Sequence, residues 1–257
     1  MTLIALALFG CRQPQIQPIG EAVGTGISIG WAAAVAARAD DPGMPACVTR
    51  SNTCADDPCA STVVIDLDAP ECAFPLGDAT TGRIEAAGTW TSDNVLLALR
   101  FLDMDIDGGT LYAPGISAVT ARLDDESAKV SVGYADQDVE GIQTGDIVVS
   151  QAGWSIEVDL AEGPAGARME LNGGGQRATG EADVVQLASV QTVMDGSCRQ
   201  NPVDGFATME RADGNADVAI TGVTFRSTCD GQAKIEASLG LDIANSQKSF
   251  PLDLWER

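Results

Sequence analysis

The fold is indicated by residues 83–106, RIEAAGTWTSDNVLLALRFLDMDI, where apolar and polar side chains alternate in two consecutive runs. The runs are residues 83–90 and 95–106, and the polar residues Thr91 to Asn94 separate them. Alternation with a period of two is typical of a β-strand that buries one of its faces. This stretch therefore predicts two consecutive strands.

Similar short runs continue to the C-terminus, separated by segments rich in Gly, Asp and Asn. Residues 124–127 and 151–153 are interpreted as hairpin connections, and the triple glycine at 173–175 as a further turn. No long stretch with helical periodicity separates these runs. Residues 77–257 are therefore predicted to form an all-β domain, an antiparallel β-sandwich or barrel of about ten strands.

The segment from Ile19 to Ala39 is apolar and carries only two charges, Glu21 and Arg38. Large apolar residues recur every four positions, and a parallel row of small residues accompanies them, as in closely packed helices. The four glycines within it oppose a helix by about 1 kcal/mol each relative to alanine. Three interpretations stay open: a helix docked on the β domain, a flexible linker, and a second contact with the membrane.

An apolar run, Leu3 to Leu8, precedes Leu8-Phe9-Gly10-Cys11, which resembles the lipobox of bacterial lipoproteins. The resemblance implies that residues 1–10 are a signal peptide and that Cys11 is acylated on sulfur, which anchors the chain in a membrane. Residues 11–39 would then be a lipid-anchored linker or apolar segment. Arg12, in place of Asp, fits outer-membrane sorting in that family, so the expected location is the cell envelope.

A second processing pattern lies at Ala37-Arg38-Ala39, which has the A-x-A form of a signal-peptidase site. Cleavage after Ala39 would remove Cys11 and release a soluble secreted or periplasmic protein. This alternative also exports the chain.

The chain has seven cysteines, so setting Cys11 aside leaves an even number. In an exported protein six cysteines predict three disulfides, formed by Cys47, Cys54, Cys59, Cys72, Cys198 and Cys229. Residues 40–76 are rich in Pro, Asp and Cys and are expected to be a loop segment with two local bridges of open pairing. Cys198 and Cys229 are expected to form the third.

Composition excludes several classes of function. The chain has no histidine, which removes the commonest catalytic base and metal ligand, so the G-x-S-x-G match at Gly26 to Gly30 cannot be a serine-hydrolase site. A formal charge of −22, from 37 Asp and Glu against 15 Lys and Arg, argues against a nucleic-acid partner.

A partial calcium-loop pattern is present at Asp103-Met104-Asp105-Ile106-Asp107-Gly108. Carboxylates at alternate positions followed by glycine match the first half of an EF-hand loop, but the position of the distal Glu is Pro114. The sequence therefore offers a weak calcium site at Asp103, Asp105 and Asp107, or else the solvated face of a strand.

We expect a lipid-anchored envelope protein that is not an enzyme, with no catalytic residue and no cofactor other than the calcium considered above. It would act as a binding, structural or assembly module with an envelope protein as partner. The alternatives are a calcium-dependent adhesion module and a hydrolase that uses a carboxylate pair on glycans.

Overall fold

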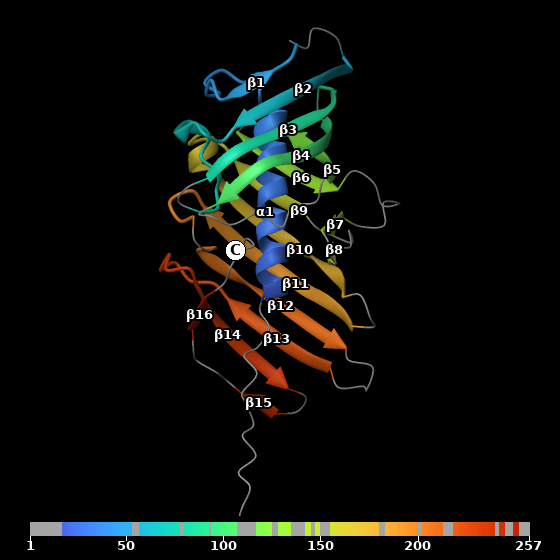
Figure 1. Cartoon of the computed structure of the whole chain (residues 1–257), viewed down its shortest axis with the longest axis vertical. Helices are drawn as coiled ribbons and strands as arrows, with labels where there is room; N and C mark the ends of the chain where they lie inside the picture. Colours follow the sequence, from blue (N-terminus) through green and yellow to red (C-terminus); the bar gives the residue numbers. More distant parts are fainter. Residues whose placement is uncertain are drawn as a thin grey trace, which may run out of the picture.

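The computed structural model describes residues 17–52, 57–77, 80–92, 94–106, 117–124, 128–134, 142–144, 147–149, 155–179, 183–199, 202–212, 218–239, 242–244 and 249–251. Within these residues the chain forms one α-helix, α1 (Gln17–Ala37), two short 3-10 turns and sixteen strands (Figure 1). The turns are η1 (Pro70–Cys72) and η2 (Pro164–Gly166). The strands are β1 (Val48–Arg50), β2 (Cys59–Asp66), β3 (Thr80–Trp90), β4 (Asn94–Ile106), β5 (Ser117–Leu123), β6 (Lys129–Tyr134), β7 (Ile142–Thr144), β8 (Ile147–Val149), β9 (Ser155–Asp159), β10 (Arg168–Thr179), β11 (Asp183–Asp195), β12 (Asp204–Ala212), β13 (Val218–Thr224), β14 (Gln232–Leu239), β15 (Asp242–Ala244) and β16 (Ser249–Pro251).

Fourteen of these strands form one sheet in the order β1-β2-β3-β4-β5-β6-β9-β10-β11-β12-β13-β14-β15, with β16 also paired to β14. The pairing is antiparallel, as in β2 with β3 and β10 with β11. β7 and β8 form a separate two-stranded hairpin. The all-β, antiparallel class expected from the sequence is confirmed.

Helix α1 lies inside the curve of this sheet. Five consecutive residues, Ala32 to Ala36, are completely buried. Because successive helical residues point about 100° apart, such a run means that the helix is covered on every side. α1 contacts β2 to β6 and β9 to β12, and Figure 1 shows it running from the level of β1–β3 to the level of β12.

The sheet therefore buries its inner face against a helix. The sequence predicted a sandwich or a barrel, in which a second sheet or full closure would do this. Among the described strands the sheet is a single layer, and β1 and β15 at its two ends do not pair with each other. The difference arises because α1 supplies the core, so neither a second sheet nor closure is needed.

Of the three interpretations of the apolar N-terminal segment, the docked helix is the one observed. A glycine-rich helix is stable here because its small residues let the strands approach closely. A Cβ built at Gly30 would lie only 2.6 Å from Cδ1 of Ile156 on β9. No helix in the described part of the chain has the combined length and hydropathy needed to cross a membrane.

The cysteine-rich segment is part loop and part sheet. A Cys47–Cys72 disulfide closes it, and Cys59 is also disulfide-bonded. The segment, expected as a loop, also contributes β1 and the eight residues of β2 to the main sheet. Its buried side chains belong to the same hydrophobic core as α1: Val48, Val63, Ile65, Leu67, Phe74 and Leu76. The β domain thus begins earlier than residue 77.

Two expected turns differ in the structure, and one is confirmed. β5 and β6 pair across the predicted connection at 124–127. In contrast, Gly173 to Gly175 lie within β10, where the register with β11 shifts and Gly173 has a φ of 149°. The glycines thus form a bulge, and pairing resumes beyond it. The hairpin expected around 151–153 is not observed. The strand before it, β8, pairs with β7, and the strand after it, β9, pairs with β6 and β10.

Candidate functional site

The interior of the sheet is occupied by side chains of α1. Trp31 is fully buried, its indole Nε1 donates a 2.8 Å hydrogen bond to the carbonyl oxygen of Pro164, and its ring meets Phe74 edge-on with centroids 5.4 Å apart. Phe74 belongs to the β2–β3 connection and Pro164 to the β9–β10 connection. These two connections therefore cover α1 together, and η1 contacts η2.

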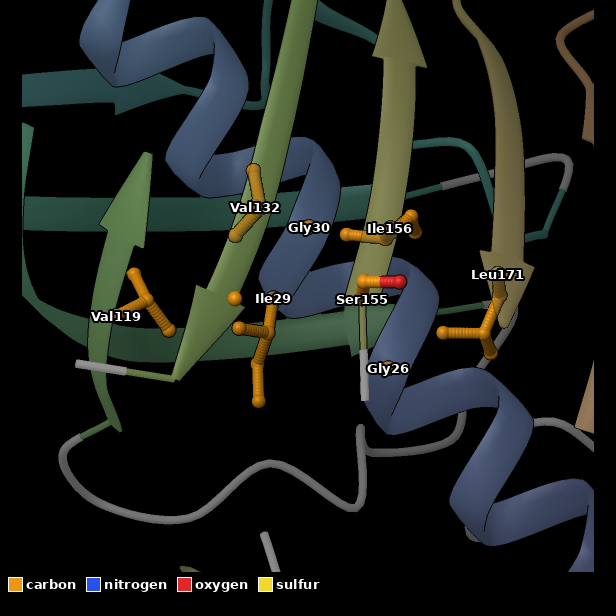
Figure 2. A pocket seen from close by; sticks show the side chains of 9 residues that line it. Gly26, Ile29, Gly30, Val119, Val132, Ser155, Ile156 and Leu171 are labelled. Carbon is orange, nitrogen blue, oxygen red and sulfur yellow. The ribbon is translucent and has the colours of Figure 1, made fainter. Parts of the chain in front are cut away.

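An apolar space beside α1 is small. Gly26, Ile29 and Gly30 face it from the helix, and Val132, Ile156 and Leu171 line it from the sheet (Figure 2). Its volume of about 20 Å³ is little more than that of one water-sized probe. This space is a packing gap, too small for an organic ligand.

Ser28, the central residue of the G-x-S-x-G match, lies within α1 and is fully buried. Its Oγ donates a 2.6 Å hydrogen bond to the carbonyl oxygen of Gly24, one turn earlier in the helix. A serine in this position satisfies its own hydroxyl and is shielded from any substrate. The match is structural, in agreement with the absence of histidine from the sequence.

Two arginines close the C-terminal end of α1. The guanidinium of Arg38 pairs with Asp41 and donates to the carbonyl oxygens of Asp124 and Lys129 at either side of the β5–β6 turn. Arg50 on β1 pairs with Asp40, and its guanidinium lies 4.1 Å above the ring of Trp90. Positive charge at this end of the helix also opposes the negative end of the helix dipole. These contacts fix the end of α1 to both β1 and the β5–β6 hairpin.

A row of alternating charges crosses the outer face of four adjacent strands. Lys129 on β6 lies opposite Asp159 on β9, Asp159 opposite Arg168 on β10, and Arg168 opposite Asp195 on β11. Opposite charges at neighbouring positions of a sheet each contribute a few tenths of a kcal/mol up to about 1 kcal/mol. The row adds to the register that the buried face of these strands sets.

In this row the pKa of the Asp195 carboxyl is lowered below its ordinary value. The backbone N–H of Ser197 donates a 2.8 Å hydrogen bond to its carboxylate and lowers the pKa, with help from the Ser197 side chain and Arg168. Partial burial acts in the opposite direction and is the weaker influence. Asp195 is therefore held ionised at the end of β11.

Two carboxylates of the charged region, Glu157 and Glu170, are directly paired across β9 and β10. Both are exposed, and they flank a shallow depression of about 50 Å³ together with Lys129, Asp159 and Arg168. A glycan hydrolase would be supported by a close, partly buried pair in a cleft. This exposed pair does not give that support.

The calcium motif falls at a bulge. Asp103 has a φ of 52°, and the register between β3 and β4 shifts at Gly82, opposite it. Asp103 and Asp105 are both exposed on β4, and Asp107 lies outside the described residues. Within the described residues no group of three or more acidic or cysteine side chains is placed to hold a metal ion. The site therefore stays a hypothesis.

Among the remaining residues expected to have a role, the structure pairs Cys198 with Cys229 and Cys47 with Cys72. The first of these pairings is the one that the sequence predicted. Cys11 and Cys54 lie outside the described residues.

The outer face of β2 to β5 is free of charge over two adjacent rows. This neutral face carries Leu96, the most exposed large apolar side chain described, at 52% exposure. Its other residues, assigned from strand register and exposure, are Ala60, Thr62, Ala87, Thr89, Ala98 and Thr120. In a chain with a net charge of −22 such a face is a candidate surface for contact with a protein.

Sequence reasoning did not find the neutral face or the charged row. Both depend on which strands are neighbours, because residues as distant as Lys129 and Asp195 join one row only after four strands pair.

A search against family models, curated proteins and solved structures finds no match to this chain.

Proposed function

We propose that this protein is a lipid-anchored module of the cell envelope that works by binding a partner and not by catalysis. One observation carries the proposal: α1 begins six residues after Cys11 and forms the core of the sheet. Processing at Cys11 keeps this helix in the mature chain. Cleavage after Ala39 would remove it, together with Trp31 and the buried alanines.

The disulfides support the export that lipid anchoring requires. Cys47–Cys72 and Cys198–Cys229 join segments 25 and 31 residues apart, and such bridges persist in oxidising compartments. Bridges of this length stabilise a domain by about 3–4 kcal/mol in the chain-entropy model.

The filled interior supports binding at the outer surface. A β-sheet that carries a ligand inside needs a cavity, and here α1 occupies that space. The neutral face of β2 to β5 is the surface we propose for an envelope protein partner, because its uncharged side chains can be desolvated at low cost.

Membrane partitioning of Cys11→Ser in the native host tests the anchor. The variant is expected to lose incorporation of a fatty-acid label and to leave the membrane fraction, while an intact disulfide content shows that it still folds. An unchanged membrane fraction together with unchanged labelling of the variant would contradict the proposal.

Site-specific photo-crosslinking tests the contact surface. A photoreactive residue at position 96 is expected to form a discrete adduct in cells, whereas the same residue at position 170, on the charged part of the outer face, is not. Equal adducts at both positions would contradict the neutral face as the binding surface.

A further inference from the structure

The two ends of α1 lie at different levels of the sheet (Figure 1). Its C-terminal end is tied to the β5–β6 turn by Arg38, while its N-terminal end lies at the level of β12 (Figure 1). Twenty-one helical residues span about 30 Å. The chain from Cys11 therefore enters the molecule at the end that carries the later strands.

The distance between Cys11 and this end of the molecule is limited by the chain. Five residues, 12–16, separate Cys11 from Gln17. Even when fully extended, six residue steps reach only about 20 Å. Val23, Ile27 and Trp31 are completely buried, so α1 cannot leave the sheet to lengthen the tether without exposing the core.

This end also presents an aromatic side chain. Phe206 on β12 is 40% exposed, and on the same outer face it lies opposite Thr224 of β13, which in turn lies opposite Lys234 of β14. An exposed aromatic ring with a lysine nearby suits the boundary between lipid headgroups and acyl chains. Leu96, the other exposed large apolar side chain among the residues that the structure describes, is on β4, toward the opposite end of the sheet (Figure 1).

We infer that the end of the sheet formed by β12 to β14 lies on the lipid bilayer, with Phe206 at the interface, and that the neutral face around Leu96 points away from it. The inference rests on the proposed anchor at Cys11. The short tether makes this orientation a property of the fold, since the domain cannot turn its distal end to the membrane.

The test uses a fluorescent amino acid incorporated at position 206 or, as the matched control, at position 96. Each protein has Cys11 coupled chemically to a maleimide lipid and is bound to vesicles of phosphatidylethanolamine and phosphatidylglycerol that contain nitroxide lipids. We expect quenching at position 206 to be several-fold stronger than at position 96. Insertion of about 20 Gly and Ser residues between Cys11 and Gln17 is expected to reduce the quenching at 206 to the level at 96.

Equal quenching at the two positions in vesicle-bound protein would overturn the inference, as would strong quenching at 206 that the long spacer leaves unchanged. Chemical coupling makes this result independent of processing in the host. If the host does not acylate Cys11, the proposed function is contradicted. The orientation on the bilayer is still tested, because the vesicle experiment uses chemically coupled protein.

Discussion

The indole Nε1 of Trp31 on α1 donates a hydrogen bond to the carbonyl oxygen of Pro164, 133 residues further along the chain. Trp31 is completely buried, so water cannot replace this acceptor. The bond therefore fixes the rotation and axial position of α1 relative to the connection that covers it. A helix that serves as the core of a sheet needs such a polar contact, because alanines and glycines alone pack without a unique register.

Replacement of Trp31 by Phe should destabilise the protein by about 2–4 kcal/mol, since it removes buried surface and leaves the Pro164 carbonyl without its donor. Trp90→Phe is the matched control: the Nε1 of Trp90 is buried without a hydrogen-bond partner among the described residues. Urea denaturation should give a clearly smaller loss for Trp90→Phe. Equal losses would show that the hydrogen bond to Pro164 contributes nothing.

Gly30→Ala should destabilise the fold by about 1–3 kcal/mol, although alanine is the better helix former by about 1 kcal/mol. The added methyl group would overlap the side chain of Ile156, which is buried at 4% exposure. In the double variant Gly30→Ala/Ile156→Ala the overlap with Cγ2 and Cδ1 is gone. The free energies of unfolding should therefore be non-additive, with the alanine at position 30 costing less when Ile156 is absent; additive values would refute the close approach.

Asp103 has a φ of 52°, a left-handed conformation that Gly and Asp tolerate and β-branched residues do not. Asp103→Val should lower the free energy of unfolding by about 1–2 kcal/mol, and Asp103→Gly should cost little because the side chain is exposed.

Thermal unfolding with calcium or magnesium tests the calcium hypothesis. If Asp103 is a ligand, calcium raises the melting temperature of the natural protein more than magnesium does, and Asp103→Gly loses this difference.

The lowered pKa of Asp195 predicts a dependence of stability on pH. The pKa of the unfolded state lies near the ordinary value of 3.8, and the folded pKa lies below it. The stabilisation is therefore complete above about pH 4 and is lost as the pH falls through the folded pKa. The natural protein should be more stable than Asp195→Asn at neutral pH, and the difference between the two should shrink as the pH falls from neutral through the folded pKa of Asp195. A difference that stays constant as the pH falls below 3.8 would contradict the assignment.

The sequence predicted the strands well where one face is buried, because an alternation such as that of residues 83–86, in which Ile84 and Ala86 are buried, records the face directly. It left α1 undecided. A helix covered on all sides shows no polar stripe, so its periodicity is weak, and its glycines oppose it locally. Burial inside the sheet, which is a tertiary property, overrides that preference.

The same limit applies to the candidate sites. The disulfide Cys198–Cys229 could be predicted because the chain is expected to be exported and because these two cysteines lie in adjoining late segments. The bulge at Gly173 to Gly175 could not, since a glycine triplet also suits a hairpin turn and only the partner strand decides between them. Neither could the neutral face, which exists only once β2 to β5 are neighbours.

The central claim is that the mature protein is anchored at Cys11 and retains α1 as its core. Mass spectrometry of the N-terminal peptide of the protein, purified from the envelope of its native host, measures this directly. The account predicts a peptide that begins at Cys11 with a diacylglyceryl group on its sulfur and continues through Arg12 into α1. A mature chain that begins at Asp40 would contradict it, because that protein would have lost the helix around which the sheet is built.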